Sequence, residues 1–103
     1  MRTDYGRHIP VEWEGMSRVF TALGDEHRQR ILMLFDAGEE LNVGHIAEQS
    51  TLARSTVSHH LKLLREARVL LAEKRGKEVW FRINKSYLLE VLGNVQGYVV
   101  DNC

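Results

Sequence analysis

Four polar residues in the middle of the chain recur at the spacing of one helix face. The spacing is i, i+3, i+4 and i+7, and the residues are Ser55, Ser58, His59 and Lys62. Their hydroxyl, imidazole and ammonium groups can reach base edges or phosphates in the major groove of DNA. Because a polar stripe is also the ordinary solvated face of an amphipathic helix, the stripe alone favours neither interpretation.

The distribution of charge separates these two interpretations. Residues 51–85 include nine cationic and three anionic residues, a net charge of +6, whereas the other 68 residues include five cationic and eleven anionic residues, a net charge of −6. The whole chain is neutral. A helix face that is only solvated is not expected to concentrate positive charge, whereas a phosphate-binding surface is. The sequence therefore favours nucleic acid as the partner.

The polar stripe belongs to a predicted helix-turn-helix at residues 42–67. The first helix is expected at about residues 43–50, with Asn42 as its N-cap, because the Asn side-chain oxygen accepts an otherwise free backbone N–H. The second is expected at about residues 54–66, and in this motif the second helix reads the major groove. Its apolar face, at i, i+4 and i+7, is formed by Val57, Leu61 and Leu64.

A basic β-hairpin is predicted at residues 69–84, directly after this helix. Its strands are expected at residues 69–74 and 79–84, and Gly76 in the loop between them can supply the positive φ of a hairpin turn. A basic hairpin tip often serves only solubility, but its position after a recognition helix favours a DNA-binding wing. The cations of this wing are Lys74, Arg75 and Lys77.

Two helices, at residues 11–23 and 87–100, are predicted to form a dimer interface. The first of them follows a polar lead-in at residues 1–10. After it, a further helix is expected from Asp25, its N-cap, to about Ala37. Each of the two outer helices has more large apolar side chains on one face than a small subunit can cover, although both could instead pack on their own subunit. The predicted interface residues are Trp13, Met16, Phe20, Leu88, Val91, Leu92, Val95 and Val99.

The whole chain has the composition of one globular domain. It has 103 residues, of which 44% are hydrophobic and 27% charged. No apolar run is long enough for a signal peptide or a membrane span, and Cys103, the only cysteine, cannot form an internal disulfide. A reducing, cytoplasmic location is therefore expected. The predicted fold is mostly α with a β-hairpin wing, in the order α-α-α-α-β-β-α.

Three stretches of the sequence resemble the ArsR/SmtB family of winged helix-turn-helix repressors. They are TALGDEHRQRILMLF, LNVGHIAEQSTLARSTVSHHLKLLREARVL and EKRGKEVWFRI, and the resemblance covers about residues 20–83. It implies a homodimer that binds a partly palindromic double-stranded DNA operator and is released by an effector. Carried over residue by residue, the base-reading positions are Arg54, Ser55, Thr56, Ser58 and His59, and the wing positions are Lys74, Arg75 and Lys77.

Two departures from the family pattern affect the recognition helix. Ala53 stands where the family often has serine, and the missing cap is expected to cost about 1 kcal/mol unless Ser55 replaces it. Arg68 stands where the family often has glycine. Either the helix ends differently here, or Arg68 adopts a strained left-handed conformation.

A third departure concerns the sensing sites of the family. Many relatives have a cysteine pair at the place of residues 42–44, or Asp, His and Glu ligands along the last helix, but this chain has no cysteine there and no histidine after His60. Metal sites need three or four converging ligands. Asp25 and His27 supply only two, and the neighbouring His59 diverges from His60 by about 100° on a helix. We therefore expect no metal and no cofactor, and the sequence does not identify an effector.

The predicted function is a sequence-specific DNA-binding transcriptional regulator, acting as a repressor. An enzyme is not expected, because the sequence has no Gly-rich phosphate loop, no Cys/His nucleophile pair and no paired carboxylates of a cleft. The alternative is a winged-helix module used for protein–protein or RNA contact. Such a module would expose apolar residues where this chain has its Ser/His/Lys stripe.

Overall fold

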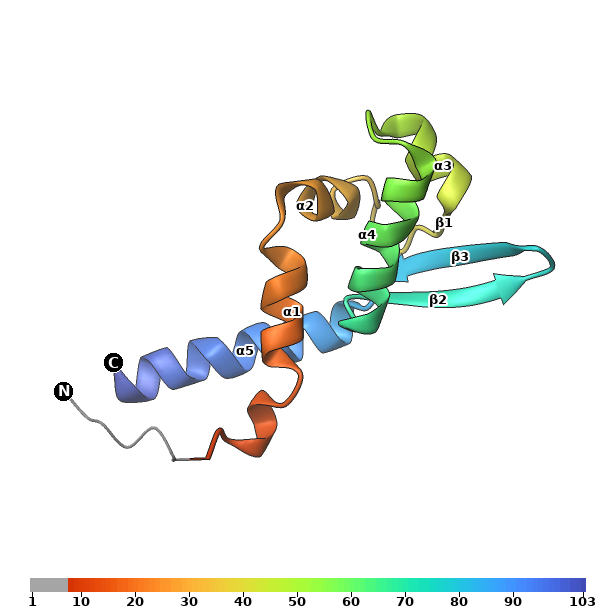
Figure 1. Cartoon of the computed structure of the whole chain (residues 1–103). Helices are drawn as coiled ribbons and strands as arrows, with labels where there is room; N and C mark the ends of the chain where they lie inside the picture. The colour runs from red at the N-terminus through yellow and green to blue at the C-terminus, as the bar shows by residue number, and fades with distance from the viewer. Residues whose placement is uncertain (1–7) are drawn as a thin grey trace.

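The computed structural model describes residues 8–103 as a helical body with a small sheet. In chain order the elements are a 3-10 helix at Val11–Trp13 (η1), α1 at Met16–Leu23, α2 at Glu26–Leu32, β1 at Leu41–Asn42, α3 at Val43–Gln49, α4 at Arg54–Glu66, β2 at Leu70–Arg75, β3 at Glu78–Ile83 and α5 at Lys85–Asn102. The β2–β3 hairpin and α5 extend from this body in opposite directions (Figure 1). Of the predicted lead-in at residues 1–10, only residues 8–10 lie within the described part.

The hydrophobic core is built around α4. Its predicted apolar residues, Val57, Leu61 and Leu64, each have at most 1% of their surface exposed. They belong to one cluster that also includes residues of α1, α2, α3 and α5, namely Val19, Ile31, Ile46 and Val91. Burying one such side chain is worth roughly 1.5–3 kcal/mol. The core therefore holds α4 with this face inwards and the opposite, polar face towards solvent.

The sheet has three antiparallel strands in the order β1-β3-β2. The hairpin of β2 and β3 confirms the predicted wing, and Gly76 at its turn has a φ of +63°. The third strand, β1, was not predicted from the sequence. It has only two residues, Leu41 and Asn42, which pair with Phe81 and Trp80, and two residues are too short to show the alternation that marks a strand.

The prediction of one continuous helix at residues 11–23 is wrong. Gly15, with a φ of +81°, separates η1 from α1, and a left-handed residue ends a helix. A Cβ atom at this position would lie 2.6 Å from the hydroxyl oxygen of Tyr87, so glycine leaves room for the end of this α5 side chain. The break turns η1 towards α5, where the ring of Trp13 meets the ring of Tyr98 edge-on at 5.0 Å.

The helix after Asp25 is shorter than predicted. Asp25 is its N-cap, as expected, and accepts a hydrogen bond from the backbone N–H of Arg28 at 3.1 Å. However, α2 ends at Leu32 rather than near Ala37. The backbone tightens there, since the N–H of Phe35 bonds to the carbonyl of Leu32, and Phe35 enters the core with 8% of its surface exposed. Conversely, α5 is longer at both ends than the predicted residues 87–100.

The end of α4 is unusual because Arg68 has a positive φ of 66°. Of the two outcomes expected where Arg68 replaces the family's glycine, this is the left-handed one. The conformation is disfavoured for residues with a Cβ atom. Two contacts compensate for it: the Arg68 carbonyl accepts a hydrogen bond from Nδ2 of Asn84 at 3.0 Å, and the guanidinium lies 4.3 Å from the ring centre of Tyr87. At the other end of α4, Ala53 provides no side-chain cap, and Ser55 does not replace it.

No helix among the described residues has both the length and the apolar character needed to cross a bilayer.

Candidate nucleic-acid interface

The solvent-facing side of α4 contains all the polar residues predicted to read DNA. Because the apolar face of the helix is buried in the core, the opposite side chains are exposed. Within residues 8–103, none of them forms a side-chain hydrogen bond or ion pair with another residue, so their donors and acceptors remain available to a ligand. These exposed residues are Arg54, Ser55, Thr56, Ser58, His59 and Lys62.

The wing presents its cations in two different ways. Lys74 and Lys77 are exposed, and no hydrogen bond or ion pair engages their side chains within residues 8–103. Arg75, in contrast, donates to a carboxylate oxygen of Glu40 and, at 2.9 Å, to Oε2 of Glu73. The hydrogen bond from Arg75 lowers the pKa of Glu73, and the bond to Glu73 in turn raises the pKa of Arg75. The Arg75 guanidinium is therefore already paired with acids of its own chain.

The wing, the start of α3 and the start of the recognition helix line one cavity of about 320 Å³, which Glu78 lines as well. Arg54, the first residue of α4, contributes to it from one side, and Lys77 contributes from the turn of the wing. Two segments that are separate in the sequence thus present cations on one concave surface. Such a surface suits a DNA duplex that contacts both the recognition helix and the wing.

The N-terminus of α3 is tied to the wing by Asn42. Its side chain forms the predicted N-cap, because Oδ1 accepts from the backbone N–H of His45 at 2.9 Å. The imidazole of His45 completes a capping box: its Nδ1 accepts the backbone N–H of Asn42 at 3.4 Å. The second group of the Asn42 amide, Nδ2, donates to Oε2 of Glu78 on β3 at 2.6 Å. The sequence predicted the cap but not this bond to the wing.

His60 has a structural position quite different from that of His59. It is buried with 9% of its surface exposed, and its Nδ1 lies 3.2 Å from Nη1 of Arg28. The same guanidinium donates to the carbonyls of Ala22 at 2.8 Å and Thr21 at 3.2 Å. His60 and Arg28 therefore join α4 to α2 and to the end of α1. Within residues 8–103, no group of three potential metal ligands converges here or elsewhere.

We expect His60 to make the fold less stable at acidic pH. Burial lowers its pKa below 6.5, although the nearby Asp25 carboxylate acts in the opposite direction. The unfolded chain therefore binds a proton more readily than the folded one, so stability present above pH 6.5 is lost as the pH falls towards the folded-state pKa. Urea unfolding at neutral and mildly acidic pH should show a smaller pH effect for His60→Gln than for the wild type. An equal pH effect in both proteins would contradict this assignment.

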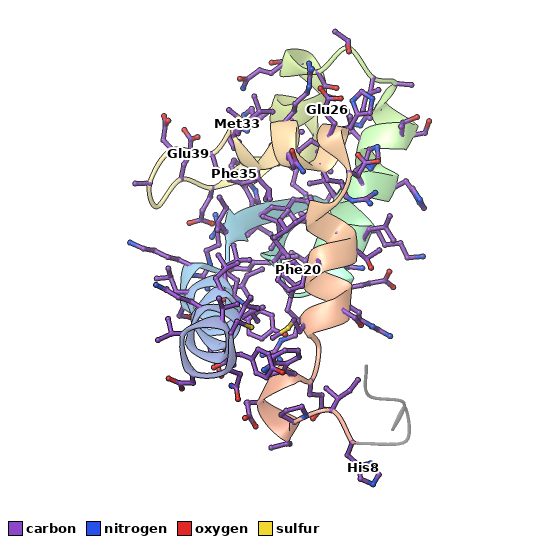
Figure 2. All side chains as sticks on the ribbon, turned by 90° about the vertical axis from the view of Figure 1, so that its left-hand side faces the viewer. His8, Phe20, Glu26, Met33, Phe35 and Glu39 are labelled. Carbon is purple, nitrogen blue, oxygen red and sulfur yellow. The ribbon has the colours of Figure 1, made fainter. Side chains whose placement is uncertain are left out.

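The predicted dimer residues do not all lie on the surface. Met16 and Val91, with 7% and 3% of their surface exposed, belong to the core of the subunit itself. Trp13, Leu88 and Val95 are half-buried against that core. The remaining three are exposed, by 41%, 45% and 51%, namely Phe20, Leu92 and Val99. Figure 2 shows Phe20 on α1. The exposed apolar residues also include Leu89 and Val100, which the sequence pattern did not single out.

Together, an exposed polar helix in a helix-turn-helix and a basic β-hairpin directly after it define a winged helix-turn-helix protein. The profile of the family described as "Bacterial regulatory protein, arsR family" matches residues 25–70, which include α2, the helix-turn-helix and the start of the wing. The chain matches this family over these elements, as its sequence had indicated. It is a DNA-binding transcriptional regulator, and the module for protein or RNA contact is not favoured.

Individual relatives agree with this assignment. The chain is 29% identical to the transcriptional repressor SdpR of Bacillus subtilis, over 82% of this chain and 92% of that protein. An ArsR-like transcriptional regulator from Rhodococcus sp. RHA1 has a TM-score of 0.76 at 21% identity, over 86% of this chain and 81% of that one. A homodimeric winged helix-turn-helix DNA-binding domain from Mycobacterium bovis has a TM-score of 0.68 at 24% identity, over 99% and 91% of the two chains. These structures confirm the predicted winged helix-turn-helix fold.

Proposed function

We propose that the protein is a homodimeric repressor that binds a partly palindromic operator in double-stranded DNA. The observation that carries the proposal is the exposed polar face of α4, which shares one concave surface with the wing through Arg54 and Lys77. In this arrangement α4 of each subunit enters the major groove, and the wing lies along the neighbouring backbone. Two subunits related by a twofold axis would read half-sites about one helical turn, or a multiple of it, apart.

The contacts are proposed to fall into two kinds. Residues in the first two turns of α4 face the base edges, because the N-terminal part of a recognition helix points into the groove. These are Arg54, Ser55, Thr56, Ser58 and His59. Cations further along α4 and on the wing neutralise phosphates, which sets the register of the protein without reading sequence. These are Lys62, Lys74 and Lys77.

The proposed dimer surface consists of the exposed apolar side chains of α1 and α5. Phe20, Leu92 and Val99 support it, because solvent would otherwise contact these large side chains. Met16 and Val91 are not part of this surface, since they already belong to the core of one subunit. A twofold axis would place each apolar face against its own copy.

A gel-shift titration against the promoter next to its own gene tests the proposed function. We expect a retarded complex that a random duplex competes away only at much higher concentration, since specific sites are typically bound at least about 10³-fold more tightly. The same titration with an RNA duplex is the control for the alternative function. Equal binding to the promoter and to the random duplex would contradict an operator next to this gene, and absence of binding to any DNA would contradict the proposal itself.

A further inference from the structure

Arg75 lies at the centre of an ion-pair network between the wing and the segment that leads into β1. Its Nη2 donates to Glu40, just before β1, and to Glu73, two residues back along β2. The guanidinium also lies 5.6 Å from the ring centre of Trp80, on β3. Glu40 and Arg75 are 35 residues apart in the sequence. The network therefore joins two segments that only the folding of the chain brings together.

A second set of contacts joins the same side of the wing to the helix-turn-helix. Asn42, the N-cap of α3, donates to Glu78 at 2.6 Å. The ring of His45, in the first turn of α3, meets the ring of Trp80 edge-on at 5.4 Å. Two residues of β1 pair with β3, and Leu70 and Phe81 hold the base of the hairpin in the core. The polar and aromatic contacts therefore help to fix the angle of the wing relative to α3 and α4.

Lys74 is placed differently from Arg75, although it is the neighbouring residue on the same strand. Successive side chains of a β-strand point to opposite faces, so the two cations project from opposite sides of the wing. Lys74 is exposed, and no acid engages it within residues 8–103, whereas Arg75 is bonded to two carboxylates. A DNA phosphate could bind Lys74 directly, but it would have to compete with both carboxylates for Arg75.

We propose that Arg75 is a positioning residue, which together with Glu40 holds the wing at its angle to the helix-turn-helix and does not neutralise a DNA phosphate. The inference rests on the proposed DNA-binding function and assigns Arg75 a different role from Lys74 and Lys77. The two partners are partly exposed, by 43% for Arg75 and 37% for Glu40. Since exposed ion pairs are individually weak, the pair adjusts the wing and is not required for folding.

Replacing Glu40 by Ala separates positioning from simple electrostatics. If the carboxylate only contributed charge, its removal next to DNA would tighten binding; if it positions the wing, its removal weakens binding. We expect the operator affinity of Glu40→Ala to fall roughly three- to tenfold, as for an exposed ion pair removed from both subunits. Glu48→Ala, which removes the same charge from the exposed side of α3, is the matched control and should bind as tightly as the wild type or more tightly.

Arg75→Ala and its salt dependence complete the experiment. Its affinity should fall at least as far as that of Glu40→Ala, because a cation is lost as well, and the double variant should be no worse than Arg75→Ala, because both substitutions remove one interaction. The slope of log K against log salt should stay at the wild-type value, whereas Lys77→Ala should reduce it by about two units per dimer. Thermal unfolding should show that all variants are folded.

The results also distinguish this inference from the proposed function. Glu40→Ala that binds as tightly as Glu48→Ala, or Arg75→Ala with a slope reduced as in Lys77→Ala, would overturn the positioning role while the wild type still binds its operator. If the wild type binds no duplex at all, the proposed function fails instead, and with it the basis of this inference.

Discussion

Replacing Leu92 and Val99 together by Glu is expected to convert the protein from a dimer to a monomer. Both side chains are about half exposed on α5, so they do not hold the fold of one subunit. Burying the exposed half of each side chain against a partner is worth roughly half of the 1.5–3 kcal/mol of full burial, and each substitution is present in both subunits of the dimer. The substitutions would also bring four carboxylates into an apolar interface, where unpaired charge is costly. Sedimentation velocity should report the mass of a single subunit.

The monomer is also expected to lose operator binding, by roughly a hundredfold or more, because one half-site no longer increases the effective concentration at the other. The matched control is Leu92→Met with Val99→Ile, which keeps the apolar character and approximate volume of both positions and should remain dimeric. Circular dichroism should show the same helix content for both double variants. A dimer that survives the Glu substitutions would place the interface on another surface.

The second large effect is expected from the recognition helix. Alanine at Ser58 or His59 removes a side chain that faces the bases, and should reduce the preference for the operator over random DNA. The expected reduction is roughly 1–3 kcal/mol for each well-formed hydrogen-bond pair to a base, and twice that in a symmetric dimer. Binding to random DNA should hardly change, because phosphate contacts supply it. Both side chains are exposed and make no hydrogen bond within residues 8–103, so neither substitution should unfold the protein.

Lys77→Ala should weaken DNA binding without reducing the preference for the operator, unlike the substitutions at Ser58 and His59. Removing an ammonium group that neutralises a phosphate weakens binding to the operator and to random DNA alike, and reduces the salt slope by about two units per dimer. Fluorescence anisotropy titrations of both duplexes at several salt concentrations measure the two quantities together. If the helix variants lose affinity uniformly and the wing variant loses specificity, then the wing, and not α4, reads the operator.

The elements with strong local signals were predicted correctly from the sequence. The bounds of α4 agree with the prediction, because Val57, Leu61 and Leu64 mark one face of the helix over two full turns. Gly76 marks the turn of the wing, and Asp25 and Asn42 mark two helix starts. The fold class therefore followed from patterns that extend over a few residues, and the resemblance to a known family agreed with them.

The errors occurred where a distant contact determines the backbone. The helix predicted at residues 11–23 breaks at Gly15, next to the hydroxyl group of Tyr87 on α5. The next helix ends early at Leu32, and Phe35 then enters the core. The strand β1 exists only because β3 lies beside it. None of these features leaves a periodic signal, since each depends on a neighbour that is remote in the sequence.

In the candidate DNA-binding site, too, some features were predictable from the sequence and others depend on the fold. The amino-acid sequence was enough to select the polar face of α4 and the basic wing, because residue type, helical spacing and the separation of charge along the chain are local properties. It could not distinguish Arg75 from Lys74, and it separated His60 from His59 only by helix face and not by partner. Those differences arise from Glu40, 35 residues before Arg75, and from Arg28, 32 residues before His60. Side-chain spacing predicts which face a residue is on, whereas its partner is known only once the chain has folded.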